Sequence, residues 1–114
     1  MIQKYIERPL LIFQRKFDIR IWVLFTQDKV YLFKEGYIRT ACEEFSTKES
    51  DVAKQFIHLT NNAIQKNADK YGQFEDGNQL SFKQLEKYIK ENYDKAFRFK
   101  CILSQIHETI IVSI

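Results

Sequence analysis

The sequence predicts an α+β fold in which an antiparallel sheet with a hairpin precedes C-terminal helices. Two observations favour the sheet: the stretch RKFDIRIWVLFT alternates with a period of two, and a turn at residues 27–29 leads into a second β-rich run, VYLFKEG. A third observation favours the helices, since apolar residues after Ser81 recur at helical spacing.

The first long strand is predicted from Lys16 to about Thr26, and its two faces differ. The apolar face carries Phe17, Ile19, Ile21, Val23 and Phe25. The other face carries Lys16, Asp18, Arg20, Trp22, Leu24 and Thr26. Because this second face begins with three charges and ends apolar, we expect it to be buried at one end and lined with ionised groups at the other.

Two explanations of these charges stay open. A solvated strand face with mutual ion pairs is the commoner arrangement. Alternatively, the charges converge with Lys34 and Arg39 of neighbouring segments, next to the polar run HLTNN. Such a group would suit a phosphate or carboxylate ligand, because guanidinium groups bind these anions through two parallel hydrogen bonds.

Weaker signals describe the middle of the chain. Residues 37–41, YIRTA, are predicted to be a short extended piece, and a helical pattern is faint in DVAKQFI, residues 51–57. The run YGQFEDGN, residues 71–78, has two glycines and several turn formers, so it is predicted to be a loop.

Two helices are predicted after this loop. Ser81 and Gln84 fit a capping box, in which each side chain bonds the backbone N–H of the other residue. The first helix then presents Phe82, Leu85, Tyr88 and Ile89 on one face. A second helix is expected from about Ala96, with Phe99, Ile102, Leu103, Ile106 and Ile110 on one side and apolar character through Ile114.

Composition limits the class of protein. A chain of 114 residues with 45% hydrophobic and 15% aromatic residues is long enough for one domain or part of one. The net charge of +3 is scattered, so nucleic acid is not implied. Without a long apolar run or a signal-like start, we expect an intracellular, soluble chain without a membrane role, in which Cys42 and Cys101 are reduced thiols.

Five motifs occur in a specific order: QKYIERPLLI, RKFDIRIWVL, VYLFKEGYIRT, HLTNNAIQK and YGQFEDGNQLSF. This series, from Gln3 to Phe82 and more loosely through the last helix, resembles the tubulin tyrosine ligase-like family of amino-acid ligases, which have an ATP-grasp fold. The resemblance implies that residues 1–114 are the central part of an ATP-grasp-like domain, and that the domain is incomplete here.

The resemblance also implies roles for individual residues. The hinge strand that contacts adenine corresponds to Gln3, Lys4, Tyr5 and Ile6. Further nucleotide-site residues correspond to Lys16, Asp18, Thr60 and Asn61. Arg20 corresponds to an arginine at the phosphate and acceptor end, and Arg39 to one that binds the carboxylate of the amino acid, so these two are the expected catalytic residues. His58 is expected to be a satisfied structural histidine.

The implied cofactors are ATP and Mg²⁺, with the metal ligands expected outside this chain, so we expect this segment alone to be inactive. The implied partners are tubulin or microtubules and a free amino acid: glutamate, glycine or tyrosine. The implied location is the cytoplasm, at the cytoskeleton, cilium or basal body. The alternative is a noncatalytic remnant or fragment that binds nucleotide weakly or holds an acidic protein tail.

Overall fold

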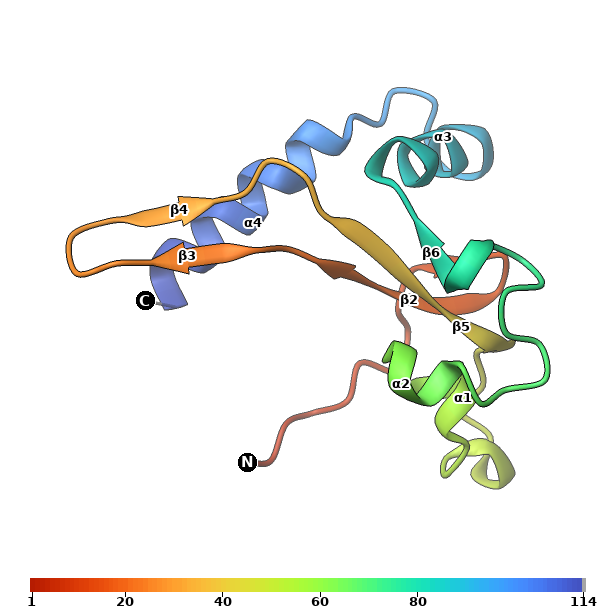
Figure 1. Cartoon of the computed structure of the whole chain (residues 1–114). Coiled ribbons are helices and arrows are strands. Elements are labelled where there is room, and N and C mark those ends of the chain that lie inside the picture. Colours follow the sequence, from red (N-terminus) through yellow and green to blue (C-terminus); the bar gives the residue numbers. More distant parts are fainter. Residues whose placement is uncertain (114) are drawn as a thin grey trace. The chain divides into compact units, whose positions relative to one another are not determined.

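The chain divides into two compact units in the computed structural model, which describes residues 1–113 (Figure 1). The first unit comprises Met1–Ile19 and Ile38–Leu80. The second comprises Arg20–Tyr37 and the chain from Ser81 onward. Each unit is therefore assembled from two stretches that are separated in the sequence.

A four-stranded sheet organises the first unit. Its strands, in the order β1-β2-β5-β6, are β1 (Leu11–Ile12), β2 (Arg15–Arg20), β5 (Tyr37–Glu44) and β6 (Gln79–Leu80). β1 pairs antiparallel with β2, so that Ile12 lies opposite Arg15, and β5 pairs antiparallel with β6, so that Ile38 lies opposite Leu80. Together with the helices, these pairings confirm the predicted α+β class.

β5 is the most buried strand of this sheet. The sequence predicted only a short extended piece over residues 37–41, but the strand continues to Glu44. Ile38, Thr40, Ala41 and Cys42 are almost completely buried. The strand lies between β2 and β6, so its two edges are both paired. The sequence underestimated it because polar and small residues interrupt its apolar pattern.

The turn between β1 and β2 holds two residues in the left-handed region, Phe13 at φ 46° and Gln14 at φ 63°. Two-residue hairpin turns with positive φ at both central positions favour Asn and Gly, because a Cβ atom makes this conformation unfavourable. The Phe13 side chain is also exposed. The turn is therefore a strained feature of the first unit.

Short helical turns connect β5 to β6: η1 (Glu49–Asp51), α1 (Gln55–His58), α2 (Asn62–Gln65) and η2 (Asp76–Asn78). The faint helical signal over residues 51–57 corresponds in part to α1. The loop predicted over residues 71–78 is confirmed apart from the single turn η2. Its glycines, Gly72 and Gly77, have φ values of 74° and 59°, a conformation that glycine adopts at little cost.

The second unit contains the predicted hairpin, formed by β3 (Val23–Phe25) and β4 (Val30–Leu32) (Figure 1). Val23 lies opposite Leu32 and Phe25 opposite Val30. The turn is closed where the Thr26 N–H donates to the Lys29 carbonyl at 2.8 Å. The hairpin and its turn are therefore confirmed.

The prediction of one continuous strand over residues 16–26 is wrong. β2 ends at Arg20, the chain is irregular at residues 21–22, and β3 pairs in a different sheet. The apolar end is also not buried, since Trp22 is 53% and Leu24 61% exposed. The alternating pattern predicted extended backbone correctly but could not show that its two halves have different neighbours.

Glycine is required at position 36, just after the hairpin. A Cβ atom there would lie 2.2 Å from the carbonyl oxygen of Arg20 and 2.7 Å from the ring of Phe82. Both distances are far below van der Waals contact, and the first involves backbone. Gly36 therefore permits a close approach that other residues would prevent.

The two predicted helices are α3 (Phe82–Asn92) and α4 (Phe99–Ser113). The capping box is confirmed, because the Gln84 N–H donates to the Ser81 hydroxyl at 3.2 Å and the Ser81 N–H donates to the Gln84 side chain at 2.8 Å. α4 begins later than the predicted Ala96. The Asp94 carboxylate accepts the Ala96 N–H at 2.9 Å, which holds the preceding residues in a turn.

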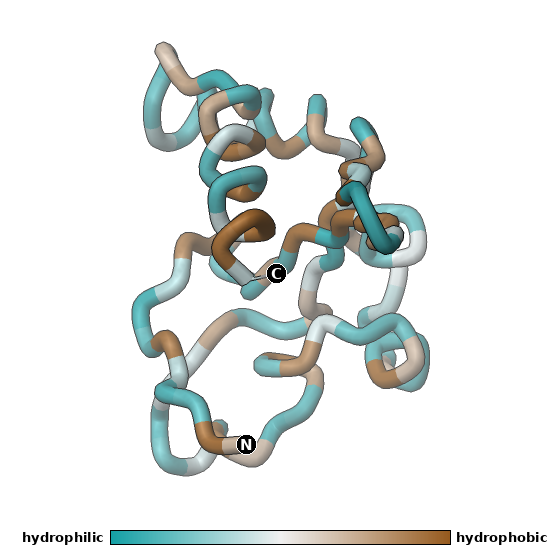
Figure 2. Tube along the Cα trace, turned by 90° about the vertical axis from the view of Figure 1, so that its left-hand side faces the viewer, coloured by the Kyte–Doolittle hydropathy of each residue, from teal (hydrophilic) through white to brown (hydrophobic). Residues whose placement is uncertain are grey.

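The core of the second unit lies between α3 and the first turn of α4. Leu85, Ile89 and Phe99 are buried, and the Phe82 and Phe99 rings stack with centroids 4.3 Å apart. The predicted apolar side of α4 is its less exposed side. Strongly hydrophobic residues continue into its last turns (Figure 2), while Ile114 lies outside the described residues. Within residues 1–113, no helix is long and apolar enough to cross a membrane.

Candidate functional site

A polar cluster formed by Lys16, Asp18, Arg39 and Thr60 lies in the first unit. Asp18 is at its centre: Arg39 donates from Nε to Oδ1 at 2.9 Å and from Nη2 to Oδ2, and the Thr60 hydroxyl donates to Oδ2 at 2.9 Å. The side chains of Arg39 and Asp18 are 17% and 35% exposed. The predicted convergence on the charged face of the strand is therefore confirmed for Arg39 and for Thr60 of the HLTNN run, whereas Lys34 is exposed and belongs to the second unit. The pair of Arg39 and Asp18 also agrees with the other explanation, mutual ion pairing on this face.

Lys16 connects the cluster to the N-terminal segment. Its ammonium group donates to the His58 carbonyl at 2.9 Å and to the Tyr5 hydroxyl at 3.5 Å. The Tyr5 hydroxyl lies 2.7 Å from His58 Nδ1, and His58 Nε2 lies 3.0 Å from the Asp51 carbonyl oxygen. Both ring nitrogens have partners, which confirms that His58 is a satisfied histidine.

A hollow of about 350 Å³ adjoins the contact between Tyr5 and His58. Its lining residues are Tyr5, Glu7, Thr47, Val52 and His58. Two rings and a valine give it a largely apolar wall, and the ammonium group of Lys16 lies 5.0 Å from the centroid of the Tyr5 ring. Lys16 is the cation placed beside this recess, and Glu7 is the charged residue in its wall. An apolar recess beside a fixed cation can accept a flat ring that carries a negatively charged group.

The other residues predicted for the nucleotide site are exposed. Gln3, Lys4 and Ile6 are exposed, and residues 1–10 form no strand with any described part of the chain. The expected strand over residues 3–6 is therefore wrong for this structure, because this segment lacks a paired backbone neighbour, while its expected contact with adenine stays a prediction. Asn61 is exposed and precedes α2, where its carbonyl accepts the N–H groups of the first turn.

Arg20, the other predicted catalytic residue, is not part of the polar cluster of the first unit. It is exposed at the end of β2 and belongs to the second unit. Its guanidinium carbon lies 5.7 Å from the centroid of the Trp22 ring. The structure thus brings Lys16, Asp18, Arg39 and Thr60 together within one unit, and Arg20 belongs to the other unit.

A buried ion pair between Arg15 and Glu75 escaped the sequence analysis. The two side chains are 1% and 7% exposed, and Arg15 also donates to the Ala41 carbonyl at 2.9 Å. Glu75 accepts the Thr40 hydroxyl at 3.0 Å, and the Phe74 ring covers the guanidinium at 4.2 Å. These contacts fasten the loop before β6 to the sheet. Alternation places Arg15 on the apolar face of the strand, the signal that could have revealed it.

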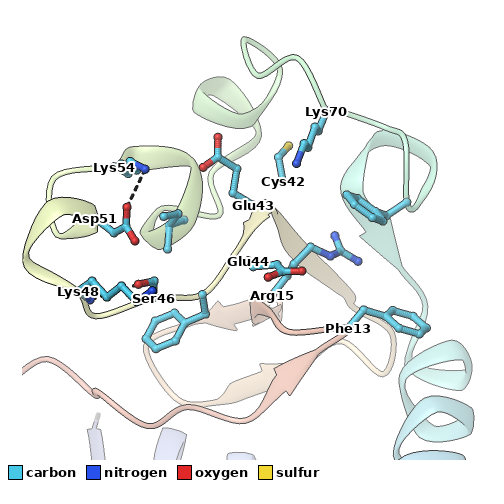
Figure 3. A pocket seen from close by; sticks show the side chains of 13 residues that line it. Phe13, Arg15, Cys42, Glu43, Glu44, Ser46, Lys48, Asp51, Lys54 and Lys70 are labelled. Atoms are coloured by element: carbon cyan, nitrogen blue, oxygen red, sulfur yellow. Dashed lines mark hydrogen bonds and ion pairs between the residues drawn. The ribbon is translucent and has the colours of Figure 1, made fainter.

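A second cavity, of about 460 Å³, lies at the end of β5 (Figure 3). It is lined by Phe13, Arg15, Cys42, Glu43, Glu44, Phe45, Ser46, Lys48, Asp51, Lys54, Ile57, Lys70 and Phe74. Lys54 pairs with Asp51 at 2.7 Å, and the remaining lining charges are of both signs. Within residues 1–113, none of the residues predicted to contact nucleotide or amino acid lines this cavity.

The thiol of Cys42 in this cavity is not poised as a nucleophile. Burial raises the pKa of Cys42 above its ordinary value, although the Asn78 amide, which donates to Sγ at 3.0 Å, opposes that rise. A raised pKa disfavours the reactive thiolate. Cys42 and Cys101 are both free cysteines, as predicted.

The described part of the chain contains no group of three or more His, Cys, Asp or Glu side chains that could hold a metal ion. Asp18 is the carboxylate of the polar cluster, and it is engaged by Arg39 and Thr60. Residues 1–113 therefore do not by themselves fit a divalent cation, which usually requires several oxygen ligands.

The geometry alone shows a half-buried polar cluster with one ion pair, Arg39 with Asp18, in an α+β fold, and sequence comparison identifies the family. The chain matches the model of the tubulin-tyrosine ligase family over residues 1–114. It therefore belongs to the tubulin-tyrosine ligase family, which confirms the resemblance carried by its five motifs.

Among its relatives, the chain is 46% identical over 97 residues to tubulin glycylase 3D of Tetrahymena thermophila, covering 80% of the chain and 9% of that protein. It is 38% identical over 117 residues to a probable alpha-tubulin polyglutamylase, Ttll1, of the same organism, covering 100% and 28%. It is 46% identical over 72 residues to human tubulin monoglycylase TTLL3, covering 60% and 9%. The chain thus spans less than a third of the length of each.

Proposed function

We propose that the chain is part of an ATP-dependent ligase that joins a free amino acid to a carboxylate of tubulin. The observation that carries this proposal is the polar cluster. In it, Asp18 lies on the same face of β2 as Lys16 and pairs with Arg39 of β5 through two hydrogen bonds. The relatives named as glycylases and a polyglutamylase favour glycine or glutamate over tyrosine as the added residue. A protein acting on tubulin would work at the cytoskeleton, including the cilium or basal body.

The residues of the first unit fit the chemistry of ATP. Lys16 supplies a fixed ammonium group, and the hollow beside Tyr5 and His58 suits a purine ring. Gln3, Lys4, Ile6 and Asn61 are exposed, and we assign them to the same nucleotide contact as an extension of this site. We also propose that the ligase uses Mg²⁺. Because the described residues do not fit a divalent cation, the ligands of the Mg²⁺ ion would lie elsewhere in a longer protein.

ATP, when bound, supplies a phosphoryl group that converts a carboxylate into an acylphosphate, whose acyl carbon the amine attacks as phosphate leaves. Arg39 would hold the carboxylate of the incoming amino acid and so orient its amine. Its pair with Asp18 fixes the plane of the guanidinium group, which reduces the entropy lost on binding. Arg20 would stabilise charge at the phosphate and acceptor end. We further propose that residues 1–114 form the central part of an ATP-grasp domain.

The test is Arg39→Lys in the complete protein that contains this segment. Lysine keeps the charge but loses the planar fork, so we expect binding of the amino acid to weaken by about 1 to 3 kcal/mol. The apparent KM for ATP should stay within about twofold, since that site depends on other residues. The measurement compares apparent KM values for ATP, glycine, glutamate and tyrosine with purified tubulin as acceptor.

Arg98→Lys is the matched control, because Arg98 is an exposed arginine of the second unit. Arg98→Lys should change neither the KM for ATP nor the KM for the amino acid. Unchanged kinetics for Arg39→Lys, or equal losses for ATP and amino acid, would contradict the proposed clamp. A complete protein that binds nucleotide but transfers none of the three amino acids would instead support the noncatalytic alternative.

A further inference from the structure

The segment of residues 58–60 lies along β2 in matching register. The His58 carbonyl accepts the Lys16 ammonium at 2.9 Å, and the Thr60 hydroxyl donates to Asp18 at 2.9 Å. Leu59 between them is extended, at φ −107° and ψ 114°. Alternate residues of an extended segment therefore meet alternate residues of the strand, and one short segment fixes the two charged side chains that β2 contributes to the polar cluster.

The ring of His58 makes a second set of contacts. Carbonyl oxygen can only accept, so Nε2 carries the proton that is donated to Asp51 at 3.0 Å. In the neutral ring Nδ1 is then an acceptor, and the Tyr5 hydroxyl donates to it at 2.7 Å. The rings of Tyr5 and Phe45 also meet His58 edge-on, with centroids 5.6 and 5.7 Å away. These contacts determine both the tautomer and the orientation of the imidazole.

Tyr5 needs such an anchor because its own segment has no regular structure. Residues 1–10 form no helix or strand, and most of them are exposed. A segment without backbone pairing loses considerable conformational entropy when it orders around a ligand. The hydrogen bond from Tyr5 to His58, over a separation of 53 residues, reduces that loss before the ligand arrives.

We propose that His58 is a positioning residue for the nucleotide: its ring holds Tyr5 at the purine side, and its carbonyl holds Lys16 at the phosphate side. This inference rests on the proposed function, which assigns Lys16 and the adjoining hollow to ATP. His58 contacts neither the reacting atoms nor the amino acid in this scheme. It acts by setting the relative placement of two nucleotide contacts.

The experiment uses the complete protein and measures the affinity of a nonhydrolysable ATP analogue, together with apparent KM and kcat. Tyr5→Phe removes only the hydroxyl, and His58→Phe removes both ring hydrogen bonds while keeping an aromatic ring. Each should weaken binding of the analogue roughly two- to tenfold, the effect of losing the hydrogen bond between Tyr5 and His58, which both variants remove. We expect KM for ATP to rise accordingly, with kcat and the KM for the amino acid within about twofold.

A double variant, a rescue variant and a matched control sharpen the test. The double variant of Tyr5→Phe and His58→Phe should bind the analogue no more weakly than the weaker-binding single variant, because both substitutions remove the same hydrogen bond. His58→Asn offers an acceptor close to the position of Nδ1 and should recover part of the affinity. Tyr71→Phe is the matched control: it removes a tyrosine hydroxyl that donates to Asn62 at 2.6 Å in the same unit, and it should leave ATP affinity unchanged.

Lys16→Met separates this inference from the proposed function. If Lys16→Met leaves ATP affinity unchanged, the nucleotide site itself is wrong. If Lys16→Met weakens ATP but Tyr5→Phe and His58→Phe do not, or if the two effects simply add, the positioning role alone is overturned. Should His58→Phe fail to fold, the comparison of Tyr5→Phe with Tyr71→Phe still decides, since neither removes a ring.

Discussion

β5 in the first unit and the β3–β4 hairpin in the second show opposite relations between composition and burial. β5, with the sequence YIRTACEE, contains threonine and charged residues, yet its middle is almost completely buried. The hairpin strands VLF and VYL are wholly apolar or aromatic, yet Leu24, Phe25 and Tyr31 are each more than half exposed. Hydrophobicity alone therefore does not decide which strand becomes the core.

The difference follows from the number of neighbours. β5 has a paired strand on each side, and the loop before β6 is fastened to it through Arg15 and Glu75. β3 and β4 pair only with each other in the described sheet. A two-stranded ribbon cannot bury its faces, whereas a strand in the middle of a larger sheet can. Burial of Thr40 is compatible with this position because its hydroxyl has two acceptors within reach, the Glu75 carboxylate at 3.0 Å and the Asn78 carbonyl at 3.2 Å.

Arg15→Met should have the largest effect on the difference in burial between β5 and the hairpin, because it destabilises β5. It leaves the buried Glu75 carboxylate without its main partner, and removing one side of a buried ion pair costs about 3 to 5 kcal/mol. Hydrogen exchange of peptides from β5 in the complete protein should accelerate strongly. Lys54→Met is the control, because it opens the exposed pair with Asp51 and should leave exchange unchanged. Equal protection in the two variants would show that the buried pair does not stabilise the first unit.

Leu85→Ala should lower the free energy of unfolding strongly, which would show that the core of the second unit lies in its helices. Leu85 is 1% exposed, and truncating a buried leucine costs about 2 to 5 kcal/mol. Leu24→Ala, at a leucine of the hairpin that is 61% exposed, should stay within about 0.5 kcal/mol. Urea unfolding of both variants in the complete protein measures the difference. A comparable loss for Leu24→Ala would mean that the longer protein covers the hairpin.

The smallest expected effect, and the one of opposite sign, is at the turn of the first unit. Replacing Phe13 and Gln14 by Asn and Gly matches the positive φ values of both positions. Relief of this unfavourable conformation should stabilise the unit by about 0.5 to 1 kcal/mol. The control, Phe33→Asn, changes another exposed phenylalanine without changing a turn. Slower exchange of β1 and β2 peptides only in the turn variant would confirm the strain; no change would contradict it.

The sequence predicted local features where the cause is local. The capping box of Ser81 and Gln84, the turn before Val30 and the loop over residues 71–78 each depend on residues close together in the sequence, and the structure confirms each. Five ordered motifs also predicted the family, because residue identities in fixed order are preserved in the sequence itself. The charged side chains of β2 could be placed on one face of the strand because their identities and spacing can also be read directly from the sequence.

Only the tertiary structure decided which residues those charges meet. Arg39 reaches Asp18 across 21 positions, Thr60 reaches it across 42, and Glu75 reaches Arg15 across 60. A period of two places residues on a face but contains no information about the neighbouring strand. The same limit explains why the alternation from Lys16 to Thr26 predicted one strand. Hydrogen bonding to different partners divides that stretch at Ile21, because β2 finds its partners in one sheet and β3 finds its partner in another.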